Sequence, residues 1–226
     1  RGAFAEYAVL PQRVICPLPE ELSLQEGTVL ENLGIAVHAV EIEHHDPGDW
    51  AVIIGAGPIG ILAAQTLVAS GVNTIITDLS EARLAFAEQH SGAIAINVRR
   101  EDPVAAVMHF TQGKGADFVI EVDAAANVHR YADILAFGGT VVVYGSGAAD
   151  IPVPFRPMLG KFATLYFFVV YALPPALMRR TLDGATALLV QGRLRHLPTA
   201  VYDLADIVAA HERVEQGANA KVLVKV

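Results

Sequence analysis

The chain has 226 residues, of which 53% are hydrophobic and 18% are charged, an apolar content far above that of a disordered chain. Its net charge of −8 and its lack of a Lys/Arg-rich run argue against nucleic acid or an anionic membrane surface as a partner. A single cysteine, Cys16, allows no internal disulfide and no cysteine-based zinc cluster, which favours a reducing, cytoplasmic setting.

No segment predicts a membrane span or a signal peptide. The longest strongly apolar stretch, residues 162–173, is 12 residues long. A transmembrane helix needs about 20. The N-terminus has no basic segment followed by a long apolar run. It also has no initiator methionine, so we expect the chain to begin partway through a longer protein.

Strands and helices are predicted to alternate from Asp49 to Gly147. Sequence patterns predict strands over residues 51–54, 73–78, 93–97, 117–122 and 140–144. They predict helices over residues 59–70, 81–90, 103–111 and 127–136. Several of these strands are almost wholly apolar, as strands buried on both faces of a parallel sheet are. We therefore predict a doubly wound parallel α/β sheet built from right-handed βαβ units.

Two flanks lie outside this pattern. Residues 1–30 contain Pro11, Pro17 and Pro19 and are predicted to form strand and loop. The patterns after residue 150 predict a strand over 161–170, helices over 177–191 and 204–216 with a short strand between them, and a last strand over 220–226.

Residues 55–60 read Gly-Ala-Gly-Pro-Ile-Gly, which is the G-x-G-x-x-G pattern of a dinucleotide-binding turn. The pattern follows an apolar strand and opens a helix, and Asp78 closes the next strand 23 residues after Gly55. This context matches a dinucleotide fold, in which an acidic residue follows about 20 residues later. A glycine-rich turn of another α/β domain is the alternative. A phosphate-binding loop of the Walker type is excluded, because no Gly-Lys-Ser/Thr follows.

Each position of this turn has a physical role in binding a dinucleotide. Gly55 permits the tight bend, and Gly57 lets a pyrophosphate approach the backbone. Gly60 allows the helix to pack closely against its strand. The helix begins at Pro58 and Ile59, and its N-terminal end, which is positive, then faces the phosphates.

Asp78 bears on the choice of cofactor. A carboxylate at this position accepts hydrogen bonds from the ribose hydroxyls and repels a 2′-phosphate, so NAD is favoured. Arg83, one turn further along, is placed to contact the same ribose and would offset part of the repulsion, so NADP is the alternative. A solvated strand end is the other interpretation of Asp78.

Four parts of the chain resemble parts of one known superfamily. They are residues 2–7, residues 30–33 with 37–39, residues 55–78, and residues 144–147 with 167–171. The first is similar to the segment that leaves a catalytic domain, and the second to a linker of polyol and threonine dehydrogenases. The third matches a nucleotide fingerprint, and the last resembles the quinone oxidoreductase branch. Together they resemble the medium-chain dehydrogenase/reductase superfamily, which includes zinc alcohol dehydrogenases and quinone oxidoreductases.

The resemblance implies a domain organisation and an activity. Residues 1–31 would be the C-terminal remnant of a GroES-like catalytic domain, residues 32–166 a Rossmann dinucleotide-binding domain, and residues 167–226 a segment returning to the catalytic domain. The implied reaction is an NAD(P)-dependent hydride transfer between nicotinamide and a small alcohol/carbonyl or quinone/enone substrate. This chain would supply the cofactor-binding half. The alternative is a non-catalytic dinucleotide-binding module, as a truncated or regulatory relative.

The resemblance also implies further cofactor-binding residues. Val122 would lie near the middle of the cofactor, and the backbone of Gly145 and Ser146 would meet the nicotinamide. Phe168 would line the nicotinamide pocket, and Lys221 aligns with a basic residue that neutralises the pyrophosphate. The alternatives are a turn residue for Ser146, a core aromatic for Phe168 and a solvated strand residue for Lys221.

Metal binding and assembly are also read from the resemblance. Glu31 aligns with a zinc-contacting position of polyol dehydrogenases, although a catalytic zinc usually needs three protein ligands. The alternative for Glu31 is a solvated or hinge glutamate. The quinone oxidoreductase branch works without metal, so whether this protein binds zinc is left open. The apolar strand over 161–170 resembles an edge that pairs across a dimer, so we expect a homodimer.

Overall fold

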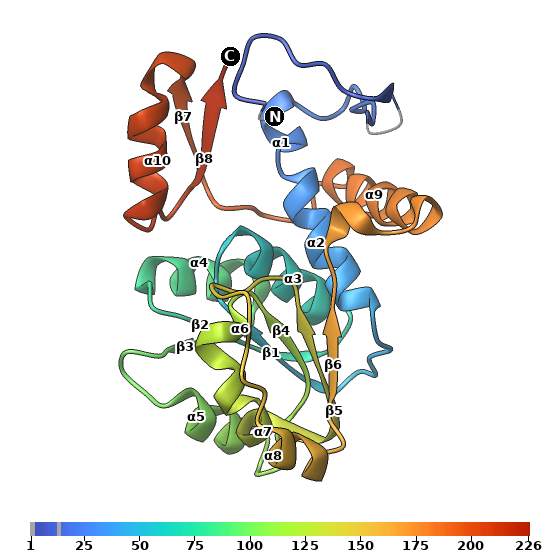
Figure 1. Cartoon of the computed structure of the whole chain (residues 1–226), viewed down its shortest axis with the longest axis vertical. Coiled ribbons are helices and arrows are strands. Elements are labelled where there is room, and N and C mark those ends of the chain that lie inside the picture. Colours follow the sequence, from blue (N-terminus) through green and yellow to red (C-terminus); the bar gives the residue numbers. More distant parts are fainter. Residues whose placement is uncertain (1–2, 13–14) are drawn as a thin grey trace. The chain divides into compact units, whose positions relative to one another are not determined.

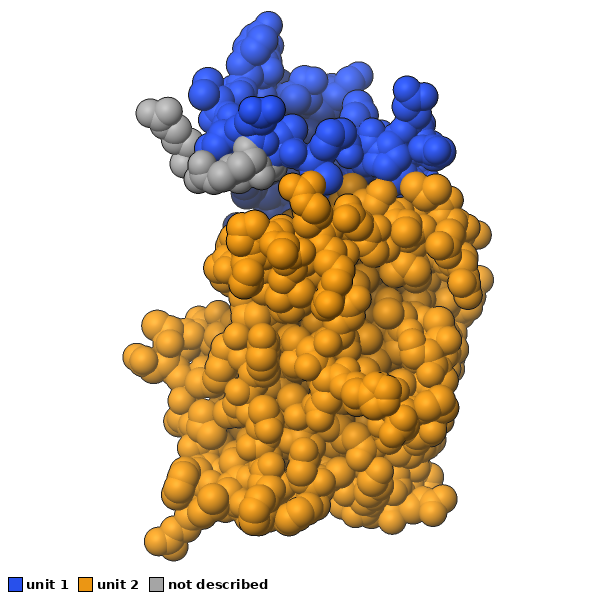
Figure 2. Space-filling model, turned by 90° about the vertical axis from the view of Figure 1, so that its right-hand side faces the viewer, with its two compact units in different colours: residues 1–29, 196–226 blue, residues 30–195 orange. Residues whose placement is uncertain are grey.

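The computed structural model of the chain describes residues 3–12 and 15–226. The chain forms two compact units (Figure 2). The larger unit holds residues 30–195, and the smaller combines the described part of residues 1–29 with residues 196–226. No helix in the described ranges is long and apolar enough to cross a membrane.

The larger unit is built on a six-stranded sheet (Figure 1). Its strands in chain order are β1 (Trp50–Ile54), β2 (Asn73–Asp78), β3 (Ile94–Asn97), β4 (Ala116–Glu121), β5 (Leu135–Val143) and β6 (Thr164–Phe167). Their order in space is β3-β2-β1-β4-β5-β6, and every neighbouring pair is parallel. This is the strand order of a doubly wound dinucleotide-binding fold, so the predicted fold class is confirmed.

Helices connect the strands and cover the sheet. They are α2 (Leu30–Glu41), α3 (Pro58–Ala69), α4 (Glu81–Ser91), α5 (Pro103–Phe110), α6 (Ala124–Asn127), α7 (Tyr131–Ile134), α8 (Phe155–Gly160) and α9 (Pro175–Val190), with 3₁₀ turns η2 (Val128–Arg130) and η3 (Val170–Ala172). These helices form two groups. In the first group, α3 packs on α2 and α4, and α2 also contacts α9. In the second group, α7 packs on α5 and α8. Strand β1 lies between β2 and β4, and its residues Ala51, Val52 and Ile53 are fully buried.

The smaller unit contains α1 (Leu24–Gly27), the parallel strands β7 (Thr199–Asp203) and β8 (Lys221–Lys225), the 3₁₀ turn η4 (Leu204–Asp206) and α10 (Ile207–Glu215). Helix α10 packs on both strands. The strand predicted within residues 1–30 is absent from the described part of that segment. Its prolines lack the N–H group that a strand ladder needs. Gly2, which opens one of the resembling segments, lies outside the described residues.

The helix predicted over residues 127–136 was wrong as a single element. The chain forms α6, η2 and α7 in succession, and β5 already begins at Leu135. The Asn127 side chain donates to the Asp123 carbonyl oxygen at 3.1 Å. The Asn127 backbone has a φ of −121°, outside the helical range, so the regular helix ends at this residue.

The strand predicted over residues 161–170 was too long, because β6 covers only Thr164–Phe167. Lys161 instead caps the end of α8, and Phe162 has a φ of 52°, which a strand cannot contain. Beyond the strand, the chain turns into η3. The short strand β6 still forms one edge of the sheet, with β5 as its neighbour.

Candidate functional site

The predicted glycine turn joins β1 to α3. Gly55 has a φ of 105°, a backbone conformation that favours glycine, and its N–H donates to the Thr77 carbonyl oxygen at 2.8 Å. A Cβ on Gly60 would collide with the Gly55 carbonyl oxygen. A Cβ on Gly57 would instead meet nothing within 4 Å, and no side chain caps the start of α3. The fold therefore requires Gly60, whereas the open face of Gly57 leaves room for an anionic group at the helix N-terminus.

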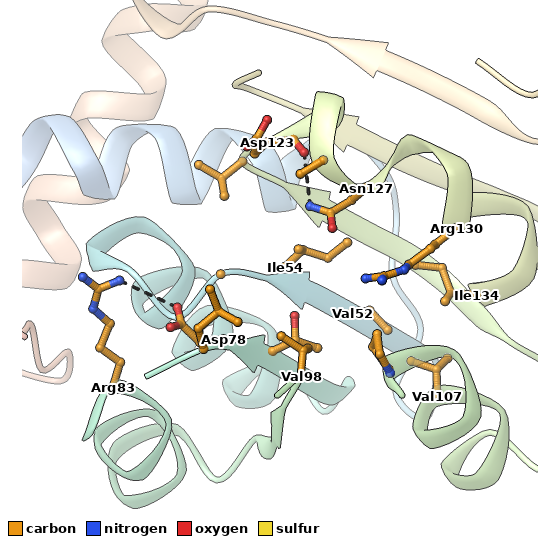
Figure 3. Close-up of a pocket in the computed structure, with 16 residues that line it drawn as sticks. Val52, Ile54, Asp78, Arg83, Val98, Val107, Asp123, Asn127, Arg130 and Ile134 are labelled. Atoms are coloured by element: carbon orange, nitrogen blue, oxygen red, sulfur yellow. Dashed lines mark hydrogen bonds and ion pairs between the residues drawn. The ribbon is translucent and has the colours of Figure 1, made fainter. Parts of the chain in front are cut away.

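Asp78 ends β2 beside this turn, and its side chain is 10% exposed. Its Oδ2 accepts a hydrogen bond from the Ala56 N–H, and its Oδ1 accepts one from the Ser80 N–H, both at 2.8 Å. The Arg83 Nη1 lies 3.8 Å from Oδ2, and Figure 3 shows the two side chains together. A carboxylate has about four acceptor sites, so Asp78 keeps capacity for further donors.

A cleft of about 540 Å³ opens at the carboxyl ends of β1, β2 and β4, and we call it the switch-point cleft. Its lining residues are Val52, Ile54, Gly55, Thr77, Asp78, Leu79, Arg83, Val98, Pro103, Val107, Val122, Asp123, Ala126, Asn127, Arg130 and Ile134. The chain order of the sheet reverses between β1 and β4, and ligands of doubly wound folds bind at such a point. Figure 3 shows Asp123 and Asn127 on the wall opposite Asp78 and Arg83.

A second cleft of about 450 Å³ follows β5 and β6, and we call it the β5–β6 cleft. Gly145, Ser146 and Phe168, all predicted to meet the nicotinamide, line it together. Ala124 also lines it and directly follows Asp123 of the switch-point cleft, so the two clefts are neighbours. The Ser146 hydroxyl donates to the Ala148 carbonyl oxygen at 2.8 Å and so closes a local turn.

Glu31 and Lys221 belong to other elements, and Gly57, Pro58, Ile59 and Gly60 are not among the residues that line either cleft. Glu31 is exposed in the first turn of α2, where its Oε2 accepts a hydrogen bond from Asn32 Nδ2 at 2.9 Å. The described residues contain no group of three or more His, Cys, Asp or Glu side chains that could hold a metal ion. Lys221 begins β8 in the smaller unit, and its N–H donates to the Pro198 carbonyl oxygen at 2.8 Å. The roles predicted for both residues stay predictions.

A buried carboxyl group at the end of β4 was not predicted from the sequence. Glu121 is fully buried, and its Oε1 accepts hydrogen bonds from the Asp123 N–H at 2.6 Å and from Asn127 Nδ2 at 3.2 Å. Burial raises the pKa of Glu121, and the nearby Asp123 carboxylate adds to that rise. Burial likewise raises the pKa of Tyr131 and Tyr144, both of which interact with Glu121. The sequence did carry a signal for Glu121, because it is a charged residue at the end of an apolar strand, and Asp78 stands in the same position in its own strand.

A buried histidine supports the wall of the β5–β6 cleft. His38 on α2 is 4% exposed, and its ring meets the Phe168 ring edge-on with centroids 4.8 Å apart. Burial lowers the pKa of His38, which favours the neutral imidazole. Phe168 is therefore packed between the cleft and a neutral ring.

Comparison with known proteins agrees with this architecture. Residues 58–189 match the family model described as zinc-binding dehydrogenase. The chain belongs to this family. The D-xylulose reductase A of Aspergillus niger is 30% identical over 229 residues, which cover 99% of this chain and 63% of that protein. A zinc-type alcohol dehydrogenase-like protein of Escherichia coli is 28% identical, over 94% of this chain and 60% of that protein.

Solved structures share the fold of this chain. An alcohol dehydrogenase of the archaeon Aeropyrum pernix superposes with a TM-score of 0.85 and 26% identity, over 98% of this chain and 64% of that chain. A quinone oxidoreductase of Pseudomonas syringae shares the fold, with a TM-score of 0.87 and 22% identity over 99% of this chain and 72% of that chain. The chain spans less than two thirds of the length of the two curated relatives above, which are named as a reductase and as an alcohol dehydrogenase-like protein.

Alanine substitutions in the glycine turn should separate folding from binding. We expect Gly60→Ala to lower the free energy of unfolding by about 2 kcal/mol or more, because its Cβ meets backbone. Gly57→Ala should cost less than about 1 kcal/mol, since its φ of −77° suits alanine. It should weaken NADH binding at least about tenfold by filling the phosphate approach. Urea unfolding and NADH fluorescence titration measure the two effects, and unchanged NADH affinity in Gly57→Ala would contradict the site.

The raised pKa of Glu121 predicts a pH-dependent stability difference. Its contribution to stability is fully present below the ordinary glutamate pKa and is lost as pH rises through the raised value, because a buried charge then forms. Glu121→Gln has no proton to lose. We therefore expect the Tm of Glu121→Gln, relative to the parent protein, to increase from about pH 5 to about pH 8. A Tm difference that stays constant over this range would contradict an ionisable, buried Glu121.

Proposed function

We propose that this chain binds the dinucleotide cofactor of an NAD-dependent oxidoreductase. The observation that carries the proposal is the switch-point cleft lined by Gly55 and Asp78, next to a turn in which the Gly57 face is open and α3 begins without a side-chain cap. An open helix N-terminus suits a pyrophosphate, and a carboxylate at the end of the second strand suits an adenosine ribose. The family assignment and the oxidoreductase names of the relatives support the same function.

The residues have distinct roles in this proposal. The turn that contains Gly57, Pro58 and Ile59 receives the pyrophosphate, and Asp78 with Arg83 holds the adenosine ribose. Val122 borders the middle of the cofactor from the end of β4, where it is 40% exposed. Residues of the β5–β6 cleft surround the nicotinamide: Gly145 and Ser146 approach it with their backbone, and Phe168 forms an apolar wall.

When bound, the nicotinamide supplies hydride transfer to or from an alcohol/carbonyl or quinone/enone substrate. The protein contributes by holding the nicotinamide in a fixed orientation and by shielding it from water with apolar side chains such as Phe168 and Val143. Glu31 could offer a zinc ion one carboxylate, but the described residues contain no group of three or more His, Cys, Asp or Glu side chains that would complete the site.

We also propose that the protein assembles as a homodimer through the edge strand β6. Tyr166, Phe167 and Val169 expose apolar surface at or beside this edge, with 40%, 57% and 42% of their surface accessible. A free strand edge with apolar side chains favours pairing with a second strand. Pairing of two β6 edges would remove this surface from water.

Asp78 should control the preference between the two nicotinamide cofactors. We expect Asp78→Ser to weaken NADH binding about tenfold and to improve NADPH binding relative to NADH, because the carboxylate no longer binds the ribose hydroxyls or repels a 2′-phosphate. Paired fluorescence titrations with the two cofactors measure the ratio. Glu81→Ser is the matched control, since Glu81 carries the same charge three residues away and pairs with Arg100. An unchanged ratio in Asp78→Ser would count against the ribose role.

Turnover tests the oxidoreductase proposal itself. We expect protein of full gene length to oxidise NADH in steady state with a quinone, an enal or a carbonyl compound, or to reduce NAD with an alcohol. Absorbance at the NADH band follows the reaction, and light scattering on the same sample gives the molar mass. Cofactor binding without turnover on any of these substrates would favour the non-catalytic module instead.

A further inference from the structure

Glu121 is the centre of a hydrogen-bond network behind the two clefts. Its side chain touches neither cleft, but the residues that it holds line the switch-point cleft. Its Oε1 accepts from the Asp123 N–H at 2.6 Å and from Asn127 Nδ2 at 3.2 Å, and Asn127 Nδ2 also donates to the Asp123 carbonyl oxygen. One buried carboxyl oxygen thus fixes the whole turn after β4.

The network continues from this turn to the loop after β5. Asp123 Oδ1 accepts a hydrogen bond from the Gly147 N–H at 2.7 Å. The Ala124 N–H donates to the Gly145 carbonyl oxygen at 3.1 Å, so two hydrogen bonds join the turn to this loop. A Cβ on Gly145 would collide with the Val122 carbonyl oxygen, which shows how closely the two segments approach. Movement of the turn after β4 would therefore move the loop that carries Gly145 and Ser146.

The other side of the carboxyl group faces the interior of the fold. Glu121 Oε2 and the Tyr131 hydroxyl are both fully buried and pair with each other, with no other hydrogen-bond partner among the described residues. The two groups interact, and Tyr131 is itself fully buried in the core. A buried polar pair of this kind is costly, so its presence beneath the clefts calls for an explanation other than stability.

We propose that Glu121 is a positioning residue for the nicotinamide half of the cofactor. Glu121 holds Asp123, and Asp123 in turn holds the Gly145–Gly147 loop. These contacts fix the distance between the turn after β4 and the loop after β5, so that one cofactor can contact both. The inference rests on the proposed cofactor site. It places no atom of Glu121 on the cofactor. Asp78, which borders the adenine half, is held instead by the hydrogen bonds that it accepts from the Ala56 and Ser80 N–H groups.

The test compares ligands that fill different parts of the site. ADP probes the adenine half, and NADH probes both halves, so their dissociation constants are measured by calorimetry on protein of full gene length. We expect Glu121→Ala to raise the Kd for NADH about tenfold and the Kd for ADP less than about threefold. Glu121→Gln keeps an acceptor for the Asp123 N–H and should stay within about threefold of the parent protein for both ligands. Rescue by glutamine is the signature of positioning through hydrogen bonds.

Two further variants complete the test. Asp123→Ala removes the acceptor of the Gly147 N–H at a partly exposed position that also lines the switch-point cleft, and it should weaken NADH about fivefold and ADP less than about twofold. It also keeps the test decisive if Glu121→Ala fails to fold. Asp117→Ala is the matched control on the same strand, because the Asp117 carboxylate accepts the Trp50 N–H at 3.0 Å at the opposite end of β4. It should lower Tm and leave both dissociation constants unchanged.

The outcomes separate this inference from the proposed function. Parent protein that binds neither NADH nor ADP would overturn the cofactor site and the inference with it. Parent protein that binds both ligands, with Glu121→Ala and Asp123→Ala equally weakened for NADH and ADP, would overturn the positioning role alone. NADH affinity unchanged in both variants would overturn it as well.

Discussion

The close passage of α3 over the end of β1 is the constraint on which the rest of the site depends. Gly60 lies so near the Gly55 carbonyl oxygen that no Cβ fits between them, and Gly55 itself needs a positive φ. The backbone therefore turns from strand to helix within a few residues, and the N-terminus of α3 stays at the carboxyl edge of the sheet. Asp78 secures this arrangement from the next strand by accepting the Ala56 N–H.

Asp78 at the end of β2 and Glu121 at the end of β4 both accept hydrogen bonds from backbone N–H groups, but in different surroundings. A strand that turns sharply leaves backbone N–H groups without a ladder partner, and a carboxyl group can accept them. Asp78 does this at the surface of the switch-point cleft, beside Arg83, and keeps acceptor capacity for a ligand. Glu121 does it in the interior, where burial raises its pKa and favours the neutral form. The first suits ligand contact, and the second suits support of the loops that make contact.

Local patterns in the chain were sufficient to predict the alternation of strands and helices in the larger unit. The glycine spacing of residues 55–60 and the apolar runs of the central strands arise from neighbours in sequence, so they can be read without coordinates. Prediction failed where single backbone angles departed from the local pattern. The φ of −121° at Asn127 ends a helix, and the positive φ of Phe162 delays the start of β6.

The amino-acid sequence by itself determined the parallel sheet, the glycine turn and the acid that closes β2, because each depends on residue type and short spacing. Only the tertiary structure decided which distant residues share a wall. Gly145 and Phe168 meet in one cleft because β5 and β6 pair in register, Val143 opposite Phe167. Glu121 reaches the loop after β5 because β4 pairs with β5 at Val143. Strand register is set by packing of the whole sheet, and no local pattern in the chain contains it.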